Sequence, residues 1–190
     1  KIVPKRWSIT ATDENLNKKL IKEIKDFRKY DYVAKFGSYL GNYYLILFFP
    51  KIWSYELFET LAGKKTKPLE YATDYENFHG RTNYASNTVG GYYAARLPIL
   101  EYLKKKKRQA SVLCLRFITE EYWAPMGVWV VREATRKAMQ AKPLEFASRK
   151  LMLRYARLIV RKKFGIDISE ILSESKILDQ IKNQKKIIDF

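Results

Sequence analysis

Two runs of β-branched and aromatic residues, separated by a short turn signal, constrain the fold of this chain most. Val33 to Leu40 and Tyr43 to Phe49 flank Gly41-Asn42. Such a link between two strand-like runs is typical of a β-hairpin, and Pro50 should end the second strand because proline lacks the backbone N–H. A third strand is expected over 109–118. Its centre is apolar on nearly every residue, which favours a place in mid-sheet.

Helical periodicity covers much of the remaining chain. Helices are expected over 14–29, after a cap at Thr12 or Asp13, and over 53–61, before Gly63. Another should run from Gly90 to about Lys107, with Pro98 kinking or restarting it. Further helices are expected over 129–140, over 144–164 and, more weakly, over 167–182. Residues 1–10 are expected to be extended, and 64–90 to form a long irregular loop that is either functional or disordered. The sum predicts an α+β fold, with a small, mostly antiparallel sheet covered by several helices and followed by a C-terminal peptide tail.

The charge balance is strongly basic. There are 37 Lys and Arg against 20 Asp and Glu, a formal net charge of +17, while hydrophobic residues make up 47% of a chain that is therefore expected to fold. A field of this sign attracts polyanions, nucleic acid first and an anionic membrane surface second. A lysine-rich surface can also be a general feature of a proteome, especially in a hot environment.

Single copies of cysteine and histidine limit the metal and disulfide chemistry. Cys114 is the only cysteine and His79 the only histidine, so an intramolecular disulfide and a multi-Cys or multi-His metal site are excluded. No run approaches the ~18 apolar residues that a membrane helix needs, and no signal peptide is visible. The expected compartment is therefore cytoplasmic, and no membrane partner is expected.

Two groups of cations could contact a nucleic-acid backbone. One is the run Lys104, Lys105, Lys106, Lys107 and Arg108, which could equally be a solvated helix end. The other is Lys150, Arg154, Arg157 and Arg161, whose i, i+4, i+7, i+11 spacing places them on one stripe of a helix that is otherwise expected to be mostly buried.

A nucleotide or phosphate pocket is the second candidate site. Glycines at a helix start expose backbone N–H groups to an anion, and Tyr92 or Tyr93 could stack a base. Arg132 and Arg136 are four residues apart and could meet one phosphate. For the segment with the glycines and tyrosines, the alternative is a tight turn with buried tyrosines. For the segment with Arg132 and Arg136, it is a packing loop with a surface ion pair. The candidate pocket residues are Arg81, Asn83, Gly90, Gly91, Tyr92, Arg96, Trp123, Arg132 and Arg136.

Acidic residues supply candidates for catalysis but no recognisable metal motif. Glu121 and Glu133 are the candidate catalytic residues, and convergence of Glu121, Glu133 and Asp74 would favour a nuclease or nucleotide-processing enzyme. Separate positions would count against an enzyme. The sequence identifies no cofactor.

The last seven residues resemble a peptide that docks on the PCNA sliding clamp. Gln184, Ile187 and Phe190 form Q-x-x-h-x-x-F, which ends on the final residue. Aliphatic and aromatic anchors of this kind fill a pocket on a partner, and Lys185 and Lys186 would suit an acidic clamp surface. The position of a second aromatic residue, common in such boxes, is missing. The alternative is that Ile187 and Phe190 anchor the tail on the domain's own core.

Several stretches together resemble the archaeal Nre proteins (NreA type), a family associated with DNA repair, and most closely their C-terminal portion. They are 4–11, 90–96, 107–112 and 123–133. The resemblance implies DNA repair and clamp binding through Gln184, Ile187 and Phe190. The family's N-terminal cysteine zinc motif is absent here, so the chain is either a fragment or a member without zinc.

The sequence therefore predicts a DNA-repair factor that binds DNA and docks on PCNA. Its expected parts are a basic α+β domain over 1–165, a helix or linker over 166–183 and the clamp-docking tail over 184–190. A nuclease or nucleotide-processing enzyme, with a pocket around 81–96 and 121–136, is one alternative. A noncatalytic RNA-binding module is the other.

Overall fold

A six-stranded mixed sheet forms the centre of the molecule. The structure is a computed structural model that describes residues 5–62, 69–122 and 127–183. The strands in spatial order are β5 (Tyr71–Glu76), β4 (Ser54–Leu61), β7 (Ser111–Ile118), β3 (Asn42–Phe49), β2 (Val33–Tyr39) and β8 (Leu144–Glu145). Only β4 and β7 pair in parallel among them. The short strands β1 (Arg28–Lys29) and β6 (Arg108–Gln109) form a separate parallel pair.

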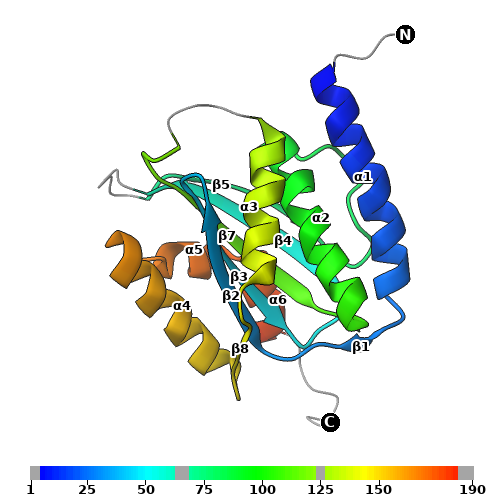
Figure 1. Cartoon of the computed structure of the whole chain (residues 1–190). Coiled ribbons are helices and arrows are strands. Elements are labelled where there is room, and N and C mark those ends of the chain that lie inside the picture. Colours follow the sequence, from blue (N-terminus) through cyan, green and yellow to red (C-terminus); the bar gives the residue numbers. More distant parts are fainter. Residues whose placement is uncertain (1–4, 63–68, 123–126, 184–190) are drawn as a thin grey trace.

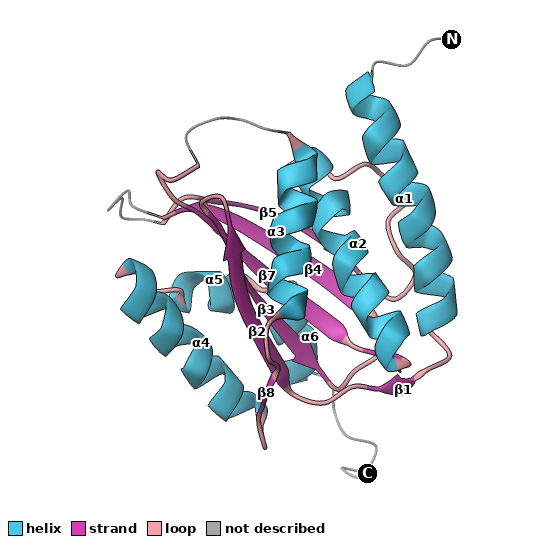
Figure 2. Cartoon of the chain, viewed as in Figure 1, coloured by secondary structure: helices cyan, strands magenta, loops and turns pink. Residues whose placement is uncertain are grey.

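Helices cover both faces of the sheet, so the molecule has three layers (Figures 1 and 2). One face carries α1 (Lys5–Ile24), α2 (Val89–Lys106) and α3 (Val128–Gln140), and the other carries α4 (Arg149–Phe164), α5 (Ser169–Glu174) and α6 (Lys176–Asn183). Strand β3 shows why two cores form. Tyr44, Ile46 and Phe48 pack toward the first helices, while Leu45, Leu47 and Phe49 pack toward the second. The α+β fold with a mostly antiparallel sheet is confirmed.

The predicted hairpin and central strand are also confirmed. Strands β2 and β3 pair from Val33↔Phe48 to Tyr39↔Asn42, and the turn between them is Leu40-Gly41, one residue earlier than expected. Both turn residues have left-handed φ, 46° and 72°, as the tightest hairpin turns require. Strand β7 lies between β4 and β3, in the middle of the sheet.

The helix predicted over 53–61 is wrong, because these residues form β4. Trp53, Leu57, Phe58 and Leu61 fit helical spacing, yet β4 is buried on both faces and so lacks the alternation that marks a half-exposed strand. Strand β5 likewise lies inside the segment expected to be an irregular loop.

Helix boundaries differ from expectation at several places. α1 begins at Lys5 and ends at Ile24, so Thr12 and Asp13 lie inside it and do not cap it. Pro98 lies within α2 without ending it, and α4 begins at Arg149. α4 is also not mostly buried, because Leu151 and Leu158 are 49% and 58% exposed.

Residues 166–183 form two short helices, α5 and α6, separated at Ser175. They contribute Ile168, Ile171, Leu172 and Ile177 to the same core as Met152 of α4. This segment therefore packs on the sheet with the rest of the domain. No helix within the described residues is both long enough and apolar enough to span a bilayer.

Candidate nucleic-acid interface

Helix α4 presents a row of cations to solvent. Ser148 caps its N-terminus by accepting the N–H of Leu151 at 3.3 Å, and Gly165 ends it with a left-handed φ of 70°. Met152, Ala156 and Val160 face the sheet. The cationic face of α4, defined as Lys150, Arg154, Arg157 and Arg161, is exposed on the opposite side, and α4 contains no acidic residue.

The described residues neutralise the cationic face of α4 only weakly, since hydrogen bonds from Ser169 and then the charges of Arg161 and Arg157 lower the pKa of the nearby Asp167 carboxyl. None of the four side chains of this face forms an ion pair with a described residue. Four arginines on the other side of the sheet have carboxylate partners instead. These pairs are Arg81–Asp74, Arg96 with Glu76 and Glu14, Arg132–Asp13 and Arg136–Glu101. Cations without a protein partner remain available to phosphate.

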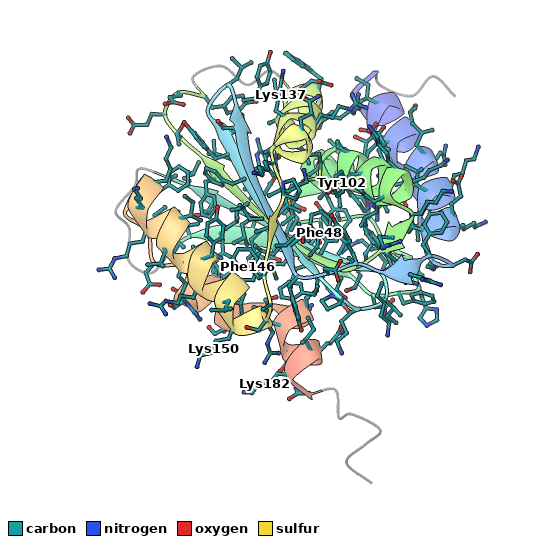
Figure 3. All side chains as sticks on the ribbon, turned by 60° about the horizontal axis from the view of Figure 1, so that its bottom comes forward. Phe48, Tyr102, Lys137, Phe146, Lys150 and Lys182 are labelled. Atoms are coloured by element: carbon teal, nitrogen blue, oxygen red, sulfur yellow. The ribbon has the colours of Figure 1, made fainter. Side chains whose placement is uncertain are left out.

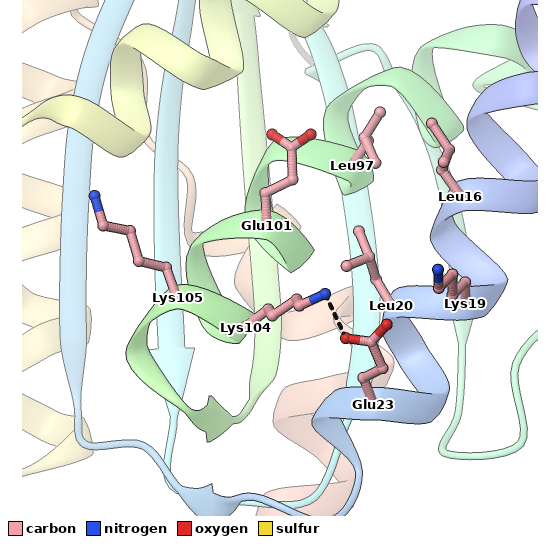
Figure 4. Close-up of a pocket in the computed structure, with 8 residues that line it drawn as sticks. All are labelled: Leu16, Lys19, Leu20, Glu23, Leu97, Glu101, Lys104 and Lys105. Carbon is pink, nitrogen blue, oxygen red and sulfur yellow. Dashed lines mark ion pairs between the residues drawn. The ribbon is translucent and has the colours of Figure 1, made fainter.

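The second predicted cationic group lies at the C-terminal end of α2. Lys107 ends the helix with a left-handed φ of 52°. Lys104 points to Glu23 of α1, with 2.6 Å between Nζ and Oε2, whereas Lys105 points away from this pair (Figure 4). Lys104, Lys105 and Lys106 belong to α2, on the face opposite α4, whereas Arg108 lies in β6. The structure therefore does not bring the two predicted nucleic-acid-binding groups together.

Lysines on different elements also point to different sides of the molecule. In Figure 3, Lys150 on α4 and Lys182 on α6 lie toward one border of the view, and Lys137 on α3 lies toward the opposite border. Surface charge is thus distributed around the fold, and α4 is distinguished by the density of its cations on one helix.

The anion site predicted at Gly90 and Gly91 is already filled by the chain itself. Asp74 Oδ2 accepts the N–H groups of Asn87 at 3.0 Å and Thr88 at 2.8 Å, directly before α2. A Cβ on Gly91 would lie 2.8 Å from Glu59 Oε1. This glycine therefore serves close packing, and the phosphate-binding role predicted for the helix start is not supported.

Tyr92 and Arg96 are buried in the core, not open to a ligand. Tyr92 is fully buried, so it cannot stack a base in this arrangement. Arg96 is 1% exposed and bridges Glu76 of β5 and Glu14 of α1. Burial raises the pKa of Glu76, and the Arg96 guanidinium partly offsets this.

The other predicted pocket residues have structural partners. The Arg81 guanidinium donates to the carbonyls of Tyr75, Asn83 and Tyr84 at 2.9 to 3.2 Å. Arg132 donates to both carboxylate oxygens of Asp13 at 2.7 and 2.6 Å. Trp123 lies outside the described residues.

Arg132 and Arg136 do not converge on one anion. Arg136 donates to Glu133 at 2.8 Å and pairs with Glu101, while Arg132 is held by Asp13 of α1. The i, i+4 spacing placed both on one side of α3, but each arginine takes a different carboxylate.

The candidate catalytic carboxylates are also separate. Glu121 accepts a hydrogen bond from the Tyr43 hydroxyl at 3.1 Å, Glu133 pairs with Arg136, and Asp74 pairs with Arg81. Across residues 5–62, 69–122 and 127–183, no group of three His, Cys, Asp or Glu side chains is placed to hold a metal ion. The convergence that would favour a nuclease is therefore not seen in these residues.

Sequence reasoning missed the carboxylates that occupy the predicted pocket. Asp13, Glu14 and Glu76 come from α1 and β5, and their arginine partners lie 20 to 119 residues later. No local spacing signals such pairs. The predicted clamp-docking residues Gln184, Ile187 and Phe190 lie outside the described residues.

Comparison with known proteins gives the family context. Residues 76–190 match the family model described as "Archaeal Nre, C-terminal", and residues 1–66 match "Archaeal Nre, N-terminal". The resemblance is therefore not confined to the C-terminal portion. β7, from the second region, lies between β4 and β3 from the first, so the two regions share one sheet. No solved structure shows significant similarity to the chain.

Three curated relatives cover most of the chain. The DNA repair protein NreA of Archaeoglobus fulgidus is 41% identical over 152 residues, which is 78% of this chain and 39% of the relative. The NreA of Haloferax volcanii is 37% identical, over 75% of this chain and 36% of the relative. The DNA repair protein NreB of Archaeoglobus fulgidus is 36% identical, over 94% of this chain and 46% of the relative. The chain spans less than half the length of each of these three relatives, and by its family-model matches it belongs to the archaeal Nre family.

Proposed function

We propose that this chain is the nucleic-acid-binding part of a DNA-repair protein and that it contacts phosphates through the cationic face of α4. Three relatives that carry the name DNA repair protein support the repair role. The observation that carries the binding role is that Lys150, Arg154, Arg157 and Arg161 are exposed and have no ion-pair partner within the described chain.

The physical reason lies in counterion release. A phosphate contact releases condensed counterions only where the protein supplies a cation that is free to replace them. Arg96 and Arg132 would first have to leave buried or half-buried carboxylates, and breaking such pairs is costly. The arginines of α4 have no such partner to give up.

Salt-dependent binding of duplex DNA tests this role. A variant with all four cationic-face residues changed to glutamine should bind more weakly at low salt. Its plot of log affinity against log salt should be less steep by about 3 to 4, because each phosphate contact contributes about 0.9 to the slope for duplex DNA. Fluorescence anisotropy over a range of salt concentrations provides both quantities.

A charge-matched variant controls for the long-range field. Lys19, Lys22, Lys137 and Lys142 are exposed and lie outside α4. Changing these four to glutamine lowers the net charge equally, and the slope should change much less. Equal loss in both variants would mean that only the overall charge attracts DNA, and an unchanged slope in the α4 variant would rule out its cationic face.

RNA is the second candidate ligand, because phosphate contacts carry no base or sugar identity. Matched single strands of DNA and RNA, titrated at one salt concentration, separate the two. Tighter binding of RNA through the same four residues would replace the repair role by that of an RNA-binding module.

Docking on PCNA is the second part of the proposal. α6 ends at Asn183, directly before the segment that carries Gln184, Ile187 and Phe190. A tether to the clamp would raise the effective concentration of the domain at DNA. Calorimetry with PCNA should show binding by the intact chain and none by a chain truncated after Asn183. Equal binding by both, or binding by neither, would contradict clamp docking.

A further inference from the structure

An apolar cavity lies between α1 and the segment that leads into α2. Its volume is about 430 Å³, and it is lined by Thr10, Ala11, Glu14, Tyr84, Val89 and Tyr93. This volume falls in the range of small-molecule sites. The cavity lies on the face of the sheet that carries α1 and α2, opposite α4 (Figure 1). Two of its lining residues, Glu14 and Tyr93, also contact the buried Arg96.

One wall of the cavity is an aromatic platform that the protein holds in place. Tyr84 is 52% exposed, and its ring stacks on Tyr93 with centroids 5.2 Å apart and 29° between the planes. The Tyr93 hydroxyl accepts the N–H of Ala85 at 2.9 Å, and Arg81 donates to the carbonyl of Tyr84 at 3.2 Å. The free side of a fixed aromatic ring is a surface on which a base can stack.

A carboxylate in the cavity wall has spare acceptor capacity. Glu14 Oε2 is taken by Arg96. Glu14 Oε1 has one ion-pair contact with a described residue, Lys18 at 3.5 Å, which is long for a hydrogen bond. Oε1 can therefore accept a hydrogen bond from a ligand that also contacts the apolar walls.

The rim of the cavity contains a strained residue. Val89 has a φ of 49° and is 51% exposed. A β-branched residue in the left-handed region is an outlier, and exposure means that burial of its side chain does not compensate for the strain. Such strain is found preferentially at ligand sites.

We propose that this cavity binds a single unstacked nucleobase, with guanine preferred. The base would stack on Tyr84, contact Val89 and donate its Watson–Crick-edge hydrogens to the Glu14 carboxylate, N1–H to Oε1 and the 2-amino group to the remaining lone pair of Oε2. Guanine presents two adjacent donors on that edge, N1–H and the 2-amino group, whereas thymine presents one. Stacking together with edge recognition is how proteins hold a base that has left the duplex. The assignment rests on the proposed nucleic-acid-binding function, which supplies the polymer.

Short thymidine oligonucleotides with one central substituted position test the assignment at fixed salt. A central guanine should bind at least about fivefold more tightly than a central abasic site, because one stacked base contributes on that scale. A central thymine should lie between them. Tyr84→Leu and Glu14→Gln should each reduce the guanine-to-abasic ratio toward one while leaving the salt slope unchanged.

The α4 variant separates failure of this assignment from failure of the proposed function. Because the cavity and α4 lie on opposite faces of the sheet, loss of the cationic face should weaken binding of duplex DNA but leave the guanine-to-abasic ratio of a short oligonucleotide unchanged. A ratio that persists in Tyr84→Leu and Glu14→Gln would place base recognition elsewhere and overturn the assignment. Equal binding of guanine and abasic strands by the unmodified protein would overturn it too, and would leave the cavity for an apolar side chain of a protein partner.

Free guanosine tests the cavity without DNA and so distinguishes the source of the base. Saturation-transfer NMR detects weak binding, and the unmodified protein should transfer magnetisation to the guanine protons while Tyr84→Leu should not. Transfer from guanosine without any oligonucleotide binding would support a free nucleoside as the ligand and reject the polymer. No transfer, together with equal oligonucleotide affinities, would reject the nucleobase entirely.

Discussion

The buried carboxylate of Glu56 on β4 accepts a hydrogen bond from the hydroxyl of Ser175 at 2.6 Å, across 119 residues of sequence. The same carboxylate accepts the N–H groups of Lys176 at 2.9 Å and Ile177 at 3.2 Å, which are free donors at the start of α6. A sheet residue thus supplies the negative charge that a helix N-terminus favours. α6, the last described element before the predicted clamp-docking segment, is fixed to the sheet in this way.

Replacing Glu56 with glutamine should lower the free energy of unfolding by about 2 kcal/mol, because an amide nitrogen would face backbone N–H donors and leave one unsatisfied. Ser175→Ala should cost about 1 kcal/mol as a lost cap. Urea unfolding measures both, and hydrogen exchange should show faster exchange at Ile177 and Leu178. Ser173→Ala, at an exposed position of α5, is the control. An unchanged exchange rate in Glu56→Gln would contradict this role.

Replacing the ion-paired Arg96 should cause a larger loss in the free energy of unfolding. Arg96→Met would leave Glu76 and Glu14 without their shared cation, and Glu76 is buried and also accepts the Trp53 indole N–H at 3.1 Å. The expected loss is about 3–5 kcal/mol. Adding Glu76→Gln should recover part of it, because the second change removes the unpaired buried charge. Additive losses in a double-mutant cycle would show that the two residues do not interact.

Local sequence patterns were sufficient where the structure depends on neighbours in the chain. The hairpin around Gly41 follows from turn chemistry, and the stripe of Lys150, Arg154, Arg157 and Arg161 follows from helical periodicity alone. Strand β4 was mistaken for a helix because a strand buried on both faces shows no alternation.

The predicted pocket failed for a different reason. A cation in a sequence shows its charge but not its partner. Arg96 pairs with Glu14 of α1, 82 residues earlier, and with Glu76 of β5, 20 residues earlier. Arg132 pairs with Asp13 of α1, 119 residues earlier. The cavity beside Tyr84 and Val89 was missed because its walls come from three separate segments. Only the tertiary structure shows which cations remain available for a ligand.

Lys35 should make stability depend on pH in the alkaline range. Its ammonium group donates to the Met139 carbonyl at 2.7 Å, and burial together with the nearby charge of Lys106 lowers its pKa from 10.5 to about 8. Between these values the unfolded chain holds a proton that the folded chain has lost. The free energy of unfolding should therefore rise with pH from about 8 to 10.5, approaching about 1.4 kcal/mol per pH unit.

Two variants isolate this contribution from the other lysines and tyrosines. Lys35→Met lacks the titrating ammonium group. Subtracting its free energy of unfolding from that of the unmodified protein at each pH therefore gives the contribution of Lys35. Lys106→Gln should raise the pKa of Lys35 and move the onset of the rise to higher pH. If the unmodified protein and Lys35→Met showed parallel pH profiles, the lowered pKa would be disproved.

Val89 should be a position where the protein gains stability and loses binding. Its φ of 49° costs about 1–2 kcal/mol for a residue with a branched Cβ, and half of its surface is exposed, so little burial is lost on replacement. Val89→Asn should therefore raise the free energy of unfolding by about 1 kcal/mol, since asparagine tolerates the left-handed region better. For a chain of this size the melting temperature should increase by roughly 2–4 °C. Val89→Ile keeps the branched Cβ and should give no gain, which makes it the matched control.

The stabilised Val89→Asn protein should bind a guanine-containing oligonucleotide less tightly, because the rim loses an apolar contact. A lower melting temperature for Val89→Asn would mean that the strain at this rim is absent.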